Sequence, residues 1–385
     1  MRKIVMIKGQ SKYNVVRCFV DQLAEGFRKN NCEAEVLDFY MGDGEKIIAR
    51  LQELQNDPPD VVFSFNGIGY DIIRKYVEVP YVGWLVDHPT IHHQRLVQWN
   101  QNAYVVCVDK SHADMVGKFY DNVGGVSFLP HGGCYGNAQC PYKDRKIDVL
   151  FSGSYTSSEA YLQQLQENLE PYEQQVAFIL LTKMQEQNLT LEQALESFLI
   201  ENEISFTNEE FTDLCLNFVE VDYFIRAFYR EELLRTLTKN GICVDIYGDR
   251  WEQFECENKE NLRLHEPLDF MESLEVMGDA KISLNSIPSF KGGGHERIFS
   301  AMLNGSLCVT DSNAYLEEQF VNGEEIFSYQ RDDMQKAADG ILYYLQHEEE
   351  AAKIADHAYK AASQKATWEI RAKELLDIME EKGIF

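Results

Sequence analysis

The chain has 385 residues, of which 45% are hydrophobic and 12% aromatic. This size and composition fit two globular domains better than one and exclude a largely disordered chain. The formal net charge of −27 repels nucleic-acid phosphates and anionic lipid headgroups, so we expect no nucleic-acid partner; solubility is the ordinary explanation of the same acidity.

The cysteines and the N-terminus indicate the compartment. The nine cysteines are scattered and form no CxxC pair, so we expect neither a zinc site nor a disulfide framework, as is usual in a reducing compartment. The apolar run Ile4–Ile7 is too short for the core of a signal peptide, and no apolar stretch reaches the length of a membrane span. These features predict a cytoplasmic protein with no bound metal ion.

Short β-branched runs alternate with amphipathic stretches over residues 1–131. Apolar residues at helical spacing predict a helix over 15–29. Six strands are predicted, at Lys3–Ile7, Ala34–Phe39, Val61–Phe65, Tyr81–Val86, Tyr104–Val108 and Val126–Leu129. Strands that alternate with helices predict a first domain built on a parallel sheet that helices cover on both faces.

A segment rich in glycine, 132–146, is interpreted as a linker to a second α/β domain over 147–364. Strands are predicted there at Ile147–Phe151, Ile242–Tyr247, Lys281–Leu284, Leu307–Thr310 and Ile326–Tyr329. The stretch at about 157–240 is far longer than an ordinary crossover between parallel strands, which predicts a helical insertion. Residues 365–385 form a last predicted helix.

The segment SIPSFKGGGHERIFSAMLNGSLCVT, residues 286–310, combines a glycine loop with a predicted helix that Gly305 ends. Glycines let a ligand approach the backbone, and the free N–H groups and dipole of a helix N-terminus favour an anion. Lys291 and Arg297 add positive charge, and His295 can donate a hydrogen bond. We interpret the loop as a diphosphate site, with an ordinary tight turn as the alternative. Glu296 is a catalytic candidate or a structural acid at the helix N-terminus.

The run HERIFSAMLNGSLCVT resembles the nucleotide-sugar segment of GT-B glycosyltransferases, especially the spore-maturation-type group with a group 1 transferase C-terminal domain. Other pieces that resemble this group follow in the family's order: DVLFSGSY, VDIYGDRW, NLRLHEPLDFMESL and DAKISLNSI. NLRLHEPLDFMESL resembles the family's edge strand and helix that face the nucleotide base. The resemblance covers roughly residues 148–329, interrupted by the insertion. KATWEIRAKELL, residues 365–376, resembles the family's final helix, which crosses back to the N-terminal domain.

The resemblance implies two Rossmann-like domains that face a cleft, and transfer of a sugar from a nucleoside diphosphate sugar to a hydroxyl of a glycan, a protein or a small molecule. A UDP-sugar is the leading candidate for the donor, and no cofactor is implied. Donor contacts are expected from Gly153, Ser154, Arg250, His265, Asn285, Lys291, Gly293, Gly294, His295 and Arg297.

At one place the sequence departs from the pattern of the family, and this leaves open whether transfer would retain or invert the configuration of the sugar. Many retaining members carry two glutamates with seven residues between them at this loop, whereas Gly292 and Ser300 stand at those positions here. A sugar-nucleotide epimerase of the same fold and a non-catalytic binding or scaffold protein are therefore the alternatives.

The segment PYVGWLVDHPTIHHQ, residues 80–94, delivers Asp87 and His88 at the carboxyl end of a buried strand, where ligands bind in parallel α/β sheets. Either residue can act as a general base on the acceptor hydroxyl. Adjacent strand residues point to opposite faces, so we expect only one to enter the cleft. Asp87 is favoured, with His92 as an orienting partner. The alternatives are a helix-capping aspartate and a metal site of Asp87, His88 and His92.

His131 lies in the turn SFLPHGG, residues 127–133, just before the linker. It is a candidate for contact with the donor across the cleft, and a plain turn residue is the alternative.

Overall fold

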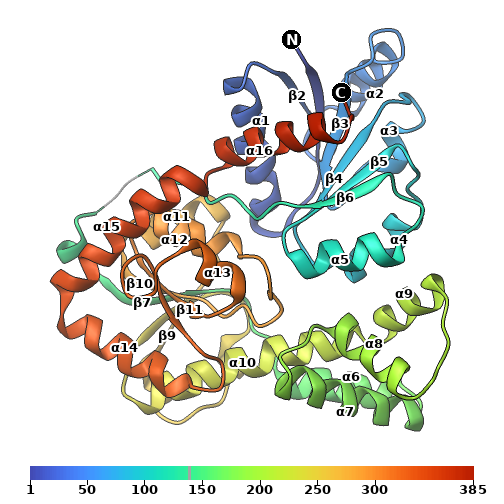
Figure 1. Ribbon diagram of the computed structural model, residues 1–385. Coiled ribbons are helices and arrows are strands. Elements are labelled where there is room, and N and C mark those ends of the chain that lie inside the picture. Colours follow the sequence, from blue (N-terminus) through green and yellow to red (C-terminus); the bar gives the residue numbers. More distant parts are fainter. Residues whose placement is uncertain (138–139) are drawn as a thin grey trace. The chain divides into compact units, whose positions relative to one another are not determined.

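The computed structural model describes residues 1–137 and 140–385, which form two compact units (Figure 1). Unit 1 comprises residues 1–134 and 363–385, and unit 2 comprises residues 135–362. The sequence predicts a first domain that ends at residue 131, a second domain over 147–364 and a final helix from 365, whereas the two units of the structure divide at residues 134 and 362. Residues 138 and 139 of the expected linker lie outside the described residues.

Unit 1 contains a six-stranded parallel sheet. Its strands are β1 Lys3–Lys8, β2 Glu33–Asp38, β3 Val61–Phe65, β4 Tyr81–Leu85, β5 Ala103–Cys107 and β6 Gly125–Phe128. The spatial order is β2-β1-β3-β4-β5-β6, a doubly wound arrangement. Every residue of β3, β4 and β5 is buried, as expected of central strands that helices cover on both faces.

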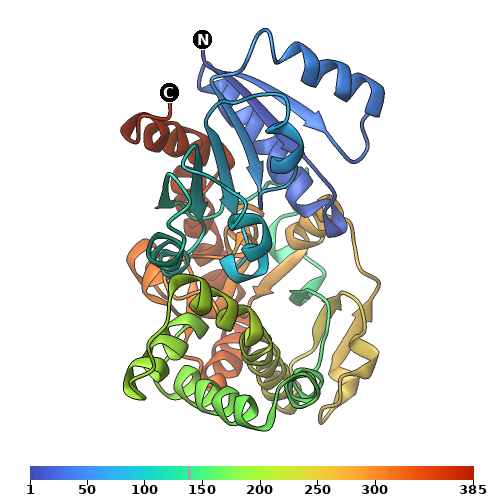
Figure 2. The same ribbon diagram turned by 90° about the vertical axis from the view of Figure 1, so that its right-hand side faces the viewer.

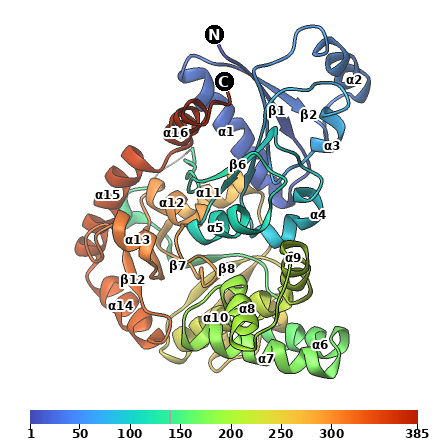
Figure 3. The ribbon, with the colours of Figure 1, turned by 45° about the vertical axis from the view of Figure 1, so that its right-hand side comes forward.

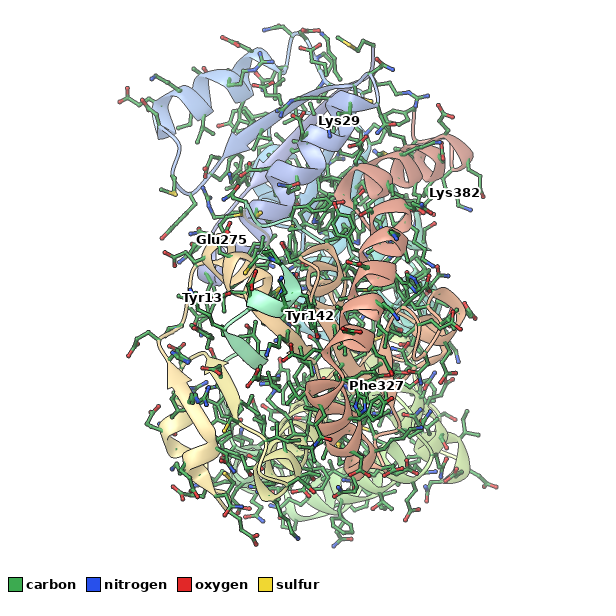
Figure 4. All side chains as sticks on the ribbon, turned by 90° about the vertical axis from the view of Figure 1, so that its left-hand side faces the viewer. Tyr13, Lys29, Tyr142, Glu275, Phe327 and Lys382 are labelled. Carbon is green, nitrogen blue, oxygen red and sulfur yellow. The ribbon has the colours of Figure 1, made fainter. Side chains whose placement is uncertain are left out.

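The helices of unit 1 are α1 Val15–Lys29, α2 Gly44–Glu53, α3 Tyr70–Ile73, α4 His93–Leu96, α5 Lys110–Phe119 and α16 Trp368–Glu381. Helices α1 and α16 lie side by side (Figure 1). An ion pair joins Lys29 Nζ to Glu369 Oε2 at 2.6 Å, and Figure 4 labels Lys29 on α1 and Lys382 just after α16. The C-terminal helix is thus an integral part of unit 1.

Unit 2 contains the second parallel sheet. Its strands are β7 Ile147–Ser152, β8 Val244–Tyr247, β9 Leu262–His265, β10 Ala280–Leu284, β11 Leu307–Asp311 and β12 Phe327–Tyr329. The order β12-β11-β10-β7-β8-β9 is that of a Rossmann sheet. Strand order reverses between β7 and β10, and this pair forms the topological switch point of the unit.

The remaining helices of this part of the chain are α11 Phe270–Gly278, α12 Glu296–Leu303, α13 Ala314–Gln319, α14 Met334–Gln346 and α15 Glu348–Lys365. Helices α14 and α15, orange to red in Figure 3, contribute Ile341 and Ile354 to the hydrophobic core around β7 and β10. Tyr142 and Phe327, labelled in Figure 4, are partly buried and pack against the same core.

Five helices fill the stretch where the sequence predicts an insertion. They are α6 Ser158–Asn168, α7 Pro171–Glu186, α8 Leu191–Glu201, α9 Asn208–Asn217 and α10 Val219–Lys239, coloured green to yellow in Figure 2. Capping boxes begin α7, α8 and α9, and these fix the helix starts within the bundle. Among the described helices, none combines the length and the apolarity that crossing a membrane requires.

Candidate functional site

The turn after β7, the loop after β10 and the N-terminus of α12 meet at the switch point of unit 2. Phe151 of β7 pairs with Leu284 of β10, so the two strands end side by side. In open parallel sheets ligands bind outside the carboxyl ends of the strands at such a point. The topology therefore locates the candidate site where the glycine loop predicts a diphosphate.

The glycine loop leads directly into α12. His295 is the N-cap of this helix, and its Nδ1 accepts a hydrogen bond from the backbone N–H of Arg297 at 3.3 Å. Asn313 Nδ2 donates to the carbonyl of Gly293 at 2.9 Å and so ties the loop to the start of α13. The helix ends at Leu303, and Gly305 follows with a φ of +67°, as the sequence predicts.

Arg297 reaches from α12 to the turn after β7. Its Nη1 donates a hydrogen bond to the carbonyl of Ser152. A Cβ at Gly153 would lie 3.2 Å from that Nη1, and Gly153 has a φ of +155°, so this turn requires glycine in both space and backbone conformation. Burial lowers the pKa of Arg297, an effect that the neighbouring Glu296 opposes. An anion bound at the turn would stabilise the guanidinium charge.

The carboxyl group of Glu296 turns toward its own helix. It is 4% exposed, and its Oε2 accepts a hydrogen bond from Ser300 Oγ at 3.0 Å. Burial raises the pKa of Glu296 to about 7, an effect that Arg297 and Ser300 oppose. This geometry favours the structural alternative for Glu296 over direct catalysis.

Replacing Glu296 by glutamine is expected to stabilise the protein more at pH 8 than at pH 5. Because the folded state raises the pKa from its ordinary 4.5 to about 7, the unfolded chain loses this proton first, and the free energy of unfolding falls as the pH rises between those values. Glu296→Gln has no such titration, so the difference in free energy of unfolding between the variant and the parent should grow by about 2–3 kcal/mol from pH 5 to pH 8. Chemical denaturation at pH 5 and pH 8 measures this difference, and Glu257→Gln, at an exposed position, is the control. If Glu296→Gln and the parent differ in free energy of unfolding by the same amount at both pH values, the pKa of Glu296 is not raised by the fold.

Two of the other predicted donor residues lie at the same turn or loop. Ser154 Oγ donates to Asp249 Oδ2 at 3.3 Å. Asn285 is 2% exposed, and its Nδ2 donates to Cys308 Sγ at 3.5 Å. Within the described part of the chain, its buried Oδ1 has no hydrogen-bond partner. Together with Ser152 and Arg297, Asn285 lines a small cavity.

The remaining three predicted donor residues have other partners. Arg250 is exposed and donates to Thr156 Oγ1 at 2.8 Å. His265 lies at the end of β9, two strands from β7, where its ring stacks on Tyr247 at 4.3 Å and its Nε2 is 2.7 Å from Asp245 Oδ1. Lys291 Nζ donates at 2.8 Å to Asn188 Oδ1, in the loop between α7 and α8.

Two arginines of α10, which the glycine-loop pattern does not indicate, also lie near this site. Arg230 Nη1 donates to the carbonyl of Ser154 at 2.9 Å, and Arg226 Nε lies 2.9 Å from both Asp222 Oδ2 and Ser289 Oγ. Both belong to the stretch that the sequence marks only as a helical insertion. The available signal was their spacing of four residues, which puts them on one face of the helix that leads into β8.

In unit 1, Asp87 and His88 follow β4 and point to different surroundings. The Asp87 side chain is 52% exposed, and its Oδ2 accepts a hydrogen bond from Asn66 Nδ2 at 3.1 Å. His88 is 5% exposed, and its Nδ1 accepts from the backbone N–H of Thr90 at 3.2 Å, which caps the short 3-10 helix Pro89–His92. The capping alternative for Asp87 is therefore wrong, since His88 is the cap, and the carboxylate is the exposed member of the pair.

A hydrogen-bond network positions Asp87. Asn66, with a φ of +54°, accepts from the backbone N–H of Val86 through its Oδ1 at 2.9 Å. Arg95 Nη1 donates to the carbonyl of Asn66 at 2.9 Å and lies 3.4 Å from His92 Nδ1. His92 Nε2 is 3.8 Å from Asp87 Oδ2. No group of three or more potential metal ligands occurs among residues 1–137 and 140–385.

His131 lies inside unit 1. It is 2% exposed and packs edge-on against Phe19 with ring centroids 5.9 Å apart. Burial lowers the pKa of His131 to about 4, an effect that Asp87 opposes. The side chain is therefore neutral at pH 7 and packed within the unit, which favours the alternative in which it is not a phosphate ligand.

Comparison with known proteins agrees with this geometry. The profile of the family described as Glycosyl transferase-like matches residues 226–377. No curated protein matches the chain by sequence.

Solved glycosyltransferase structures share the fold over nearly the whole chain. Sucrose-phosphate synthase from Thermosynechococcus elongatus has a TM-score of 0.54 at 10% identity, with 99% of each chain covered. HepE from Anabaena, in complex with UDP and glucose, has a TM-score of 0.56 at 12% identity, with 99% of this chain and 100% of that chain covered. An α-glucosyltransferase in complex with UDP and a 13-mer DNA has a TM-score of 0.61 at 10% identity, over 98% and 99% of the two chains.

The chain therefore has the GT-B fold, with two parallel sheets and flanking helices. Its matched segment is glycosyl transferase-like, which confirms the resemblance seen in the sequence. The chain thus combines the GT-B fold with a glycosyl transferase-like segment at residues 226–377.

Proposed function

We propose that this protein transfers a sugar from a nucleoside diphosphate sugar to a hydroxyl group of an acceptor. The observation that carries the proposal is the site at the switch point of unit 2, where the partly buried Arg297 and a glycine loop meet a helix N-terminus. A UDP-sugar is the proposed donor. HepE, which has the same fold, forms a complex with UDP and glucose.

The proposed reaction breaks the bond between the anomeric carbon and the diphosphate oxygen and forms a bond from that carbon to the acceptor oxygen. The leaving diphosphate gains negative charge, which Arg297 and the N–H groups at the start of α12 stabilise. These groups take the place of a divalent ion, so we propose activity without metal. Asp87 accepts the proton of the acceptor hydroxyl.

The acceptor is proposed to be a glycan, a protein or a small molecule in the cytoplasm. The net charge of −27 opposes binding of nucleic acid. One neighbour of the same fold, the α-glucosyltransferase, is in complex with DNA, so a test of acceptors should include an oligonucleotide as a comparison.

A panel of UDP-, GDP-, ADP- and dTDP-sugars in the presence of EDTA tests this function. A bound donor should raise the melting temperature, since a ligand at a hundredfold excess over its Kd stabilises a fold by about 2.7 kcal/mol. With an acceptor pool added, a transferase releases free nucleoside diphosphate. An epimerase would convert the sugar without that release, and a scaffold protein would bind without turnover; complete loss of activity in EDTA, restored by magnesium or manganese, would contradict metal independence.

Replacing Arg297 by alanine is expected to weaken nucleoside diphosphate binding by about 1.5–3 kcal/mol, the scale of a hydrogen bond to a charged group. Titration calorimetry with the diphosphate of the best donor measures the loss. Unchanged affinity in a folded variant would remove Arg297 from the site.

A further inference from the structure

A second guanidinium group approaches the turn after β7 from the helical insertion. Arg230 Nη1 of α10 donates to the carbonyl of Ser154 at 2.9 Å, and Arg297 Nη1 of α12 donates to the carbonyl of Ser152. Carbonyl groups two residues apart lie within about 7 Å of each other. The two arginines therefore bracket Gly153, at the point where strand order reverses.

The two positive charges are poorly compensated. Burial, together with the nearby charges of Arg297 and Arg226, lowers the pKa of Arg230 to about 10. The neighbouring carboxylate Glu231 accepts hydrogen bonds from Tyr155 Oη at 3.0 Å and from Ser158 Oγ at 2.8 Å. Arg230 and Arg297 donate hydrogen bonds to neutral carbonyl groups, and the carboxylates of Glu231 and Glu296 offset their charges only in part.

Unsatisfied polar atoms lie at the same place. The Nε of Arg230 is buried and has no hydrogen-bond partner among the residues that the structure describes. Asn285, 2% exposed, likewise leaves its Oδ1 unbonded there and shares a small cavity with Arg297. Buried polar atoms without partners are uncommon in folded proteins. The Arg230 Nε is a donor and fits the oxygen of an anion, whereas the Asn285 Oδ1 is an acceptor and fits a donor group of the ligand or solvent.

We propose that Arg230 binds the diphosphate of the donor together with Arg297, so that helix α10 of the insertion forms part of the donor site. The inference rests on the proposed function and extends it to a residue outside the glycine loop. A diphosphate has the oxygen acceptors and the negative charge that both guanidinium groups need.

Helix α10 is suited to hold this arginine in place. Its C-terminal half contributes Leu233, Leu234 and Leu237 to the hydrophobic core of unit 2. The same helix packs against α6, α7, α8 and α9 of the insertion. Arg230 is therefore carried by one helix that joins the hydrophobic core of unit 2 to the insertion.

The test compares Arg230→Gln with Arg235→Gln on the same helix. Arg235 is 40% exposed and pairs with the carboxylates of Glu232 at 3.0 Å and Glu231 at 3.2 Å. Titration calorimetry with UDP, GDP, ADP and dTDP should show that Arg230→Gln raises the Kd of the bound diphosphate by about tenfold to a hundredfold. Arg230→Lys keeps the charge but not the fork of donors, so its Kd should lie between those of the parent and Arg230→Gln. The Kd of Arg235→Gln should equal that of the parent.

The melting temperature without ligand separates binding from structure. Because glutamine removes a crowded positive charge yet can still donate to the carbonyl of Ser154, Arg230→Gln should melt at or above the temperature of the parent. A clearly lower melting temperature would make Arg230 structural and overturn the inference. Equal affinity of the parent and Arg230→Gln for the diphosphate would also overturn the inference about Arg230 and leave the proposed function intact. If the parent binds none of the diphosphates, the proposed function and the inference are both wrong.

Discussion

Replacing Asp87 by asparagine is expected to lower the rate of sugar transfer at least about a hundredfold while nucleotide affinity stays within about twofold, because general-base groups contribute factors of this size. The substitution keeps the shape of the side chain and its place after β4. It removes the group that accepts the acceptor proton. The steady-state kcat and the Kd of the nucleoside diphosphate, measured on the same preparation, check both parts.

The geometry of the pair Asp87 and His88 supports this choice of base. His88 is buried and uses its Nδ1 to cap the following 3-10 helix, so that nitrogen is engaged in structure. The Asp87 carboxylate is half exposed and accepts a hydrogen bond from Asn66 Nδ2. A carboxylate that is held in place and still reachable by solvent is suited to receive a proton from a bound hydroxyl.

Asp71→Asn provides the matched control for Asp87→Asn. Asp71 is an exposed carboxylate on α3 of the same unit, so its replacement changes the net charge equally and should leave kcat unchanged. Turnover of Asp87→Asn within a few-fold of the parent would refute the assignment, as would loss of nucleotide binding.

The sequence predicts most strands of the two sheets because they are short apolar runs between turn residues, whereas β9, with no β-branched residue, is indicated only by the family resemblance. β3 and β4 are examples, since all their residues are buried and apolar runs of that kind have no helical face. The predicted strand at Ile242–Tyr247 begins instead at Val244. Ile242 is buried, but its N–H bonds to the carbonyl of Leu237 at the end of α10. Hydrophobicity marks burial and does not by itself mark strand pairing.

The candidate site is only partly readable from the sequence. The glycine loop and Arg297 are adjacent in the chain, so local pattern finds them. Arg230 precedes Arg297 by 67 residues and reaches the turn after β7 only because α10 packs beside it. The partner of Lys291, Asn188, likewise lies in the insertion. Contacts of this kind depend on tertiary packing, which periodicity and composition do not contain.

The 3-10 helix after β4 shows a second reason why the sequence does not predict every side-chain role. Aspartate and histidine stand next to each other before Pro89, and both side chains can accept a hydrogen bond from a helix N-terminus. The strand end turns His88 inward and Asp87 outward. The outcome depends on which face of β4 is packed, and the order of the two residues alone does not decide it.

Replacing Trp368 by alanine is expected to destabilise unit 1 by about 3–5 kcal/mol, the usual cost of removing a large aromatic side chain from a core. Trp368 is 1% exposed and begins α16. Its ring centroid lies 4.9 Å from that of Phe19 and 5.6 Å from those of Phe65 and Trp84. The indole joins helices α1 and α16 to strands β3 and β4, so its loss opens a cavity that these rigid elements cannot close.

Hydrogen exchange measures the effect of Trp368→Ala separately in the two units. Amides of β3 and β4 exchange through unfolding of unit 1, and amides of β7 and β10 provide an internal reference in unit 2. Trp368→Phe, which keeps one aromatic ring and loses the second ring together with the Nε1 hydrogen bond to Cys134 Sγ at 3.2 Å, should cost less than Trp368→Ala. If the β3 and β4 amides of Trp368→Ala kept the protection of the parent, α16 would not be an integral part of the unit 1 core.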